Sequence, residues 1–175
     1  MSSVYLTFKR INDLNQSFVE RIGPPDECTS ALGHVTIGFS WLEQSLETNI
    51  AKLAKLSPDI APAFTSELSF KVKVGVLSSL VRVDPPLREF NHGSEDKVEM
   101  WDDIVRMLYE CEALRNKIVH SHWSPPRGDK IHRTKTTAKA KKGVSVASEE
   151  LSSAYLLDVY DYILNVEWVL NEFFL

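Results

Sequence analysis

A chain of 175 residues with 43% hydrophobic and 25% charged residues has the size and composition of one globular domain, which excludes a disordered or fibrous protein. Its net charge of -4 argues against a protein that coats nucleic acid through bulk positive charge. The average hides one basic segment. Residues 127–142 carry seven Lys or Arg and one acidic residue, Asp129, so thirteen basic and twenty-three acidic residues lie elsewhere.

Features that the chain lacks disfavour several classes of protein. No window reaches the roughly 18 apolar residues of a membrane span, and the first ten residues lack the basic and apolar regions of a secretion signal. Cys28 and Cys111 are too few for a disulfide framework or a zinc site, so we expect two buried, reduced thiols. The sequence predicts a cytoplasmic protein without membrane association, metal or cofactor.

The first half of the chain contains three predicted helices. Residues 8–22 place Leu14, Phe18 and Ile22 four apart, which indicates a short lead-in helix that a Gly-Pro-Pro sequence stops at 23–25. Residues 26–57 carry an unbroken apolar stripe and predict a long helix ended by Pro58. Residues 63–83 indicate another helix, although an alternation of apolar residues over 70–76 is also typical of a strand.

The second half contains two more helices and the basic segment. A helix is predicted from about residue 94 to 120, capped by Ser94, and another from about 152 to the last residue. Between them, residues 124–148 are polar and turn-rich, and form a basic loop or a small hairpin anchored by Ile131, Val144 and Val146. The expected fold class is all-α, a single domain over 1–175 with a lead-in (1–25) and an antiparallel four-helix bundle (26–175).

The last predicted helix has an unusually broad apolar face. Tyr155, Val159, Tyr162 and Val166 form one stripe, and further apolar residues flank it. Such a face indicates burial on two sides. A four-helix bundle covers one side, so we expect a second copy of the chain on the other, as a homodimer.

Arg115 breaks the apolar pattern of the helix over 94–120. Steps of four, three, four and three residues connect Ile104, Leu108, Cys111, Arg115 and Ile118, so a guanidinium stands where the pattern expects an apolar side chain. A buried arginine requires a carboxylate, a phosphate or a wet cleft. At about 100° per residue, Asn116 and His120 lie on the same side of the helix end, where the amide of Asn116 is expected to orient the imidazole.

The segment LRNKIVHSHW, residues 114–123, resembles the Arg, polar residue, variable residues, then His motif of HEPN domains. The stretch GHVTIGFSWLEQSLETNIAKL, with Trp41, Leu42 and Glu43, is similar to the opening helix of many bacterial HEPN proteins. The resemblance covers about residues 28–172 in helix order, but only the short motif is specific.

The resemblance implies a helical dimer whose motifs line a shared cleft and cut single-stranded RNA without metal, leaving 2',3'-cyclic phosphate and 5'-hydroxyl ends. In this chain His120 is expected to transfer protons, Arg115 to stabilise the charge of the transition state, and Asn116 to position His120 or a phosphate oxygen. A role in defence or as a toxin, with an antitoxin or regulatory protein as partner, is part of that expectation. Further RNA contacts are assigned to His122, Arg127, Lys130, Arg133 and Lys135.

Three alternatives remain open from the sequence. Arg115 is equally well explained by an ion pair with Glu43, Glu47 or Glu112, in which case Glu43 supports the fold. The protein is then a structural helical dimer, and the match to the motif is accidental. A separate alternative is a non-catalytic HEPN-like module that binds a nucleotide, an RNA or a protein partner through the same cleft. The pair His120 and His122 invites a metal site, but no second ligand cluster at a diagnostic spacing accompanies it.

Overall fold

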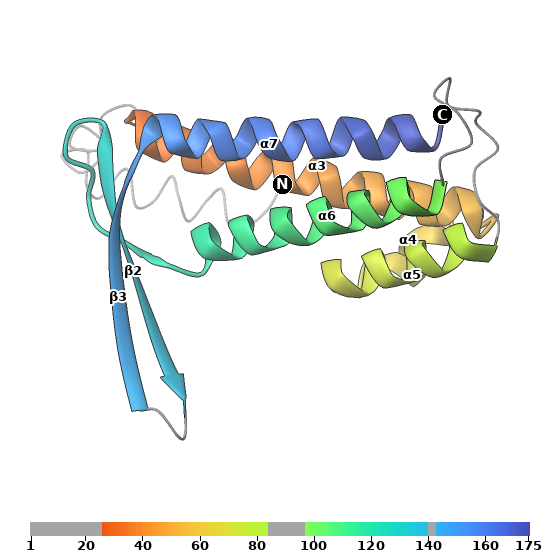
Figure 1. Ribbon diagram of the computed structural model, residues 1–175, viewed down its shortest axis with the longest axis horizontal. Helices are drawn as coiled ribbons and strands as arrows, with labels where there is room; N and C mark the ends of the chain where they lie inside the picture. The colour runs from red at the N-terminus through yellow and green to blue at the C-terminus, as the bar shows by residue number, and fades with distance from the viewer. Residues whose placement is uncertain (1–25, 84–96, 140–142) are drawn as a thin grey trace, which may run out of the picture.

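The computed structural model describes residues 26–83, 97–139 and 143–175. In chain order its elements are α3 (Glu27–Leu53), α4 (Ala61–Thr65), α5 (Phe70–Val83), α6 (Lys97–Val119), β1 (His122–Trp123), β2 (Lys130–Lys139), β3 (Gly143–Ser152) and α7 (Ser153–Phe173) (Figure 1). The lead-in helix predicted within residues 1–25 lies outside the described residues. No described helix is long and apolar enough to cross a membrane.

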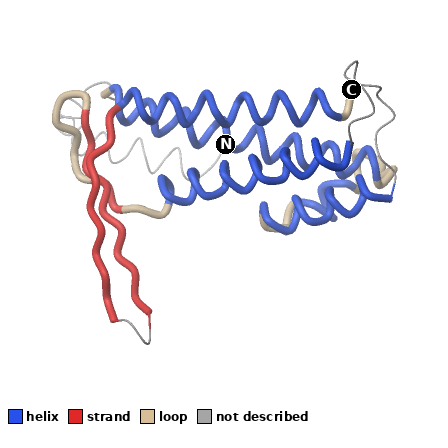
Figure 2. The backbone as a smooth tube through the Cα atoms, viewed as in Figure 1, coloured by secondary structure: helices blue, strands red, loops and turns tan. Residues whose placement is uncertain are grey.

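The predicted all-α four-helix class is wrong, because a three-stranded antiparallel sheet in the order β1-β2-β3 accompanies five described helices (Figure 2). The segment expected as a loop or small hairpin forms two ten-residue strands paired from Lys130↔Ser152 to Lys139↔Gly143. The helix predicted over 63–83 is two helices, α4 and α5. The hydroxyl of Ser69 accepts from the N–H of Val72 (3.4 Å) and caps the second one.

The bundle is not an antiparallel up-and-down arrangement. In the contacts between α3 and α7, the residue numbers rise together along both helices: Gly38 lies beside Tyr160, and Ser45 lies beside Glu167. The two helices therefore run parallel. The α5 helix runs the same way, since Phe70 packs on Phe39 and Lys73 binds Glu43 further along. Only α6 runs in the opposite direction among these four helices (Figure 1).

The long helices form one apolar core. The stripe predicted for α3 is buried, and the side chain of Asp26 caps this helix by accepting from the N–H of Thr29 (2.9 Å). That hydrogen bond lowers the pKa of Asp26.

Trp101 of α6 contacts Phe173 of α7, with ring centroids 5.2 Å apart. The largest fully buried side chains are Trp101, Phe173, Leu42, Leu46, Leu77, Ile104, Leu108, Leu156, Ile163, Leu170, Val35 and Val74.

The β2–β3 hairpin is attached to the bundle only at its base. Ile131 and Leu151, opposite each other in the register, are both buried in the core. From there the two strands project away from the helices (Figure 2). β3 leads directly into α7, where the side chain of Ser152 caps the helix by accepting from the N–H of Tyr155 (3.1 Å). The base of the hairpin therefore lies at the C-terminal end of α6 and the N-terminal end of α7.

Candidate functional site: the C-terminal end of α6

Arg115 lies half-buried on the inner side of α6, where its guanidinium carbon is 5.2 Å from the centre of the Phe39 ring. The same ring packs against Phe70 at the start of α5, with centroids 4.7 Å apart. The face of the Phe39 ring supports the planar guanidinium by a cation–π contact. Figure 1 shows that α6 continues past the start of α5, so the last turn of α6 is not covered by that helix.

Arg115 forms no ion pair with a carboxylate among the described residues. Its Nη1 donates to Oδ1 of Asn116 at 3.0 Å, a neutral acceptor that leaves the positive charge uncompensated. The carboxylates of Glu43 and Glu47 bind Lys73 instead, at 2.7 and 2.5 Å. The ion-pair explanation of Arg115 is therefore wrong for Glu43 and Glu47, and a charged group with free donors remains at the end of α6.

His120 is the first residue after α6 and its side chain is exposed. Its backbone N–H donates to the carbonyl of Asn116 at 3.2 Å, which closes the last helical turn. The expected side-chain hydrogen bond between Asn116 and His120 is not present in the described structure, where the amide oxygen of Asn116 accepts from Arg115. Arg115 and Asn116 thus form one unit, and the imidazole of His120 is open to a ligand one turn away.

Four of the five residues expected to contact RNA are exposed, but they do not lie on one surface. His122 faces Thr134 across β1 and β2, and Lys130 is engaged with Glu150 at 3.2 Å. Arg127 precedes the hairpin in a turn. Lys135 lies further along β2 on the face that contains Arg133, whereas Lys130 occupies the opposite face, because successive strand residues alternate.

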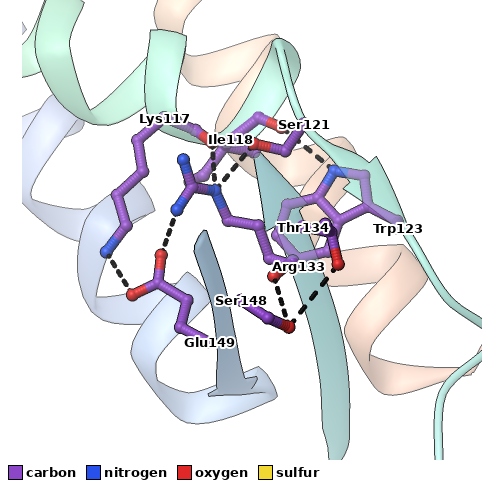
Figure 3. Close-up of polar contacts among 8 residues, drawn as sticks. All are labelled: Lys117, Ile118, Ser121, Trp123, Arg133, Thr134, Ser148 and Glu149. Atoms are coloured by element: carbon purple, nitrogen blue, oxygen red, sulfur yellow. Dashed lines mark hydrogen bonds and ion pairs between the residues drawn. The ribbon is translucent and has the colours of Figure 1, made fainter. Parts of the chain in front are cut away.

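Arg133 has a different position from the one expected for an RNA contact. The whole residue is only 7% exposed. Nε donates to the main-chain carbonyl of Lys117 at 2.6 Å and to the hydroxyl of Ser121 at 2.7 Å, and Nη1 pairs with Glu149 (Figure 3). Lys117 binds the other oxygen of Glu149 at 3.1 Å. Arg133 therefore joins the hairpin to the last turn of α6.

This group, Lys117, Ser121, Arg133 and Glu149, is called the α6–hairpin clamp below. Burial acts to raise the pKa of Glu149, but the hydrogen bonds and charges of Lys117 and Arg133 outweigh it and hold that pKa below its ordinary value. Trp123 adds a further link by donating from its ring nitrogen to the carbonyl of Ile118 at 3.0 Å. Two carbonyls at the end of α6, those of Lys117 and Ile118, thus accept hydrogen bonds from the sheet, and the carbonyl of Lys117 also accepts from the hydroxyl of Ser121 at 2.6 Å.

Sequence reasoning missed the clamp, because Arg133 and Glu149 are cross-strand partners only in the observed register. It also missed Lys73, which is 3% exposed. This residue lies in the alternation of apolar residues over 70–76, which is also typical of a strand. Burial acts to lower the pKa of Lys73, but the hydrogen bonds and charges of Glu43 and Glu47 raise it above its ordinary value. Both Lys71 and Lys73 alternate with the apolar residues of this segment, and only Lys73 is buried, so no signal in the sequence separates the two lysines.

Among the described residues, no group of three or more His, Cys, Asp or Glu side chains is arranged to hold a metal ion. No family model, curated protein or solved structure matches the chain.

Proposed function

We propose that the C-terminal end of α6 binds and cleaves single-stranded RNA, with Arg115, Asn116 and His120 as the reacting site. The observation that supports this proposal is the uncompensated charge of Arg115, whose only described polar partner is the amide oxygen of Asn116. A phosphate diester supplies the missing negative charge. It accepts hydrogen bonds from the remaining N–H groups of the guanidinium and from the amide nitrogen of Asn116.

The proposed chemistry is transesterification. The ribose 2'-oxygen attacks phosphorus while its proton passes to an imidazole, and the bond to the 5'-oxygen breaks as a protonated imidazole donates a proton to it. The products are a 2',3'-cyclic phosphate and a 5'-hydroxyl. Arg115 stabilises the charge on the phosphorus oxygens in the transition state, and the exposed His120 has the accessibility that both proton transfers need.

Two imidazoles divide these roles if a second copy of the chain brings its own His120 to the same phosphate. A homodimer with a composite site is therefore part of the proposal, as the resemblance to HEPN domains suggests. A defence or toxin role, with a protein antitoxin, is the corresponding biological context. The exposed Lys135 on the hairpin is proposed to contact the RNA backbone.

The second candidate is a non-catalytic module that binds RNA or a nucleotide at the same place. One observation favours it: Asn116 is engaged with Arg115, so among the described residues nothing orients the imidazole of His120 for proton transfer. Arg115 and Asn116 then bind phosphate on their own, and His120 contributes little.

The test is incubation of the purified chain with end-labelled single-stranded RNA in EDTA, with product ends read on the same gel. We expect wild type to leave cyclic phosphate ends, and Arg115→Ala and His120→Ala to lower the rate by about 10²-fold or more. Arg106→Ala is the matched arginine control, exposed on the same helix and paired with Asp103. His34→Ala, an exposed histidine of α3, is the matched histidine control.

Anisotropy of the same RNA separates the two candidates. Binding that is lost in Arg115→Ala and Asn116→Ala but kept in His120→Ala, without cleavage by wild type, would replace the nuclease with the binding module. Cleavage that persists in all site variants would come from a contaminant and would refute the proposed site. Cleavage that EDTA abolishes would refute the metal-independent mechanism.

A further inference from the structure

The outer part of the hairpin, residues 134–136 of β2 and 143–148 of β3, is called the arm. At the base of the hairpin Ile131 is 3% and Leu151 8% exposed, whereas Val144 and Val146 on the arm are 70% and 65% exposed. These two valines lie on the same face of β3, since they are two residues apart. The arm therefore presents apolar side chains to solvent away from the core of its own chain.

An isolated two-stranded hairpin is marginally stable in water, and extra strands or an apolar surface to pack on are needed to stabilise it. In the described structure β2 is the only strand that pairs with β3, so the outer edge of β3 presents unpaired N–H and C=O groups along its ten residues. Exposed edges of this kind add a further strand readily unless charges, prolines or bulges protect them. β3 contains no lysine, arginine or proline.

Charge distinguishes the two edges of the hairpin. On the arm, β2 carries the exposed Lys135, and two copies of this strand would bring like charges together. β3 carries only Glu149 and Glu150, at its base, and both are paired within the chain: Glu149 with Lys117 and Arg133, Glu150 with Lys130. The outer part of β3 is thus neutral. A second copy of the same strand can pair with it without charge repulsion, whereas the phosphates of a nucleic acid find no cation on it.

We propose that two copies of this chain associate by antiparallel pairing of their β3 edges, which joins the two three-stranded sheets into one. A two-fold axis through the arm places Val144 and Val146 of one copy beside the valines of the other on the same face, and it keeps the four glutamates at the two ends of the interface. The association does not depend on the proposed nuclease activity.

The pairing also has a consequence for the site. The α6–hairpin clamp fixes the base of each hairpin to the α6 end of its own chain, so antiparallel pairing about an axis through the arm places the two α6 ends at opposite ends of the shared sheet. This interface is therefore separate from the composite dimer of the proposed function, in which two His120 side chains meet at one phosphate.

Oligomeric state and cross-linking test this interface. We expect a dimer by light scattering after size exclusion, and we expect Val144→Lys and Val146→Lys to raise the dimer dissociation constant by about tenfold or more. Thr136→Lys is the matched control, because Thr136 lies directly across from Val146 on the same face but on β2. Circular dichroism checks that each variant is folded.

Single cysteines at positions 144 to 147 in turn, under mild oxidation, should give cross-linked dimers, and the fastest position defines the register. A cysteine at Thr136 should not, because two strands of β3 would separate it from its counterpart by about 14 Å. The native Cys28 and Cys111 are buried and do not compete. A monomer at every concentration, a dimer that the valine variants leave intact, cross-linking at Thr136 equal to that in β3, or dimers formed only with RNA would each overturn the proposal.

Discussion

Nε of Arg133 in β2 lies 2.6 Å from the main-chain oxygen of Lys117 in the last turn of α6. This hydrogen bond crosses from the sheet to the helix, and Glu149 neutralises the same guanidinium from the next strand. The basic segment therefore contains at least one cation whose partners are within the protein. The position of the hairpin relative to the proposed RNA site depends on that side chain.

The first prediction concerns the stability of the clamp. Arg133→Ala should lower the free energy of unfolding by about 2–4 kcal/mol, because the carboxylate of Glu149 and the carbonyl of Lys117 lose a buried donor. Urea unfolding followed by circular dichroism measures it. Arg127→Ala, an exposed arginine of the same segment, should change little, and equal losses in the two variants would contradict a structural role specific to Arg133.

A second prediction separates Arg115 from Arg133. Arg115→Gln should abolish phosphate-dependent RNA binding yet cost less stability than Arg133→Ala, since Arg115 is half-exposed and its described polar partner is neutral. RNA binding by anisotropy and urea unfolding should be measured on the same preparations. If Arg115→Gln unfolds the protein as strongly as Arg133→Ala, Arg115 belongs to the core and not to a binding site.

The close approach of α3 and α7 gives a third prediction. A Cβ added at Gly38 would lie 2.9 Å from the ring of Tyr160, whereas one added at Gly33 on the same helix meets nothing within 4 Å. Gly33→Ala should therefore stabilise the protein by about 0.5–1 kcal/mol through helix propensity. Gly38→Ala should lose that gain or destabilise, and equal stabilisation of both variants in thermal unfolding would refute the tight α3–α7 contact.

A fourth prediction follows from the raised pKa of Lys73. Because the folded pKa lies above the ordinary value of 10.5, the stabilisation from Lys73 is fully present below that pH and is lost as the pH rises through the folded pKa. Lys73→Met should cost roughly 2–3 kcal/mol at neutral pH. The stabilities of wild type and variant should then converge at strongly alkaline pH.

Urea unfolding across pH 7 to 12 checks this convergence. Lys71→Met, an exposed lysine of the same helix, serves as the control and should track wild type throughout. A difference between wild type and Lys73→Met that stays constant across the range would mean that packing, and not the charge of Lys73, stabilises α5 against α3.

The fifth prediction concerns acid. The folded pKa of Glu149 lies below its ordinary value of 4.5, so its contribution is present above that pH and is lost as the pH falls through the folded pKa. Glu149→Gln should lower stability at neutral pH and should lose less stability than wild type between pH 5 and 3. The exposed Glu67, changed to Gln, should follow wild type, and parallel acid profiles for all three proteins would count against the clamp.

The periodicity of the sequence was sufficient to locate the long helices and the faces they bury. The stripe predicted within 26–57 is the buried stripe of α3, and the helix predicted over 94–120 is found at Lys97–Val119. Local signals determine these features, because apolar spacing reflects which side of a helix leaves water. The break of that pattern at Arg115 is likewise visible from the residues alone.

Only the tertiary structure decided how those elements pair. Apolar spacing defines a buried face but carries no information on which helix covers it or in which direction, so the parallel course of α3 and α7 was not predictable. The arm lies outside the core, and its polar strands give no strong alternation to recognise. The partners of Arg133 and Lys73 come from distant segments. Whether a cation binds a carboxylate, as these two do, or only a neutral amide among the described residues, as Arg115 does, therefore depends on three-dimensional packing.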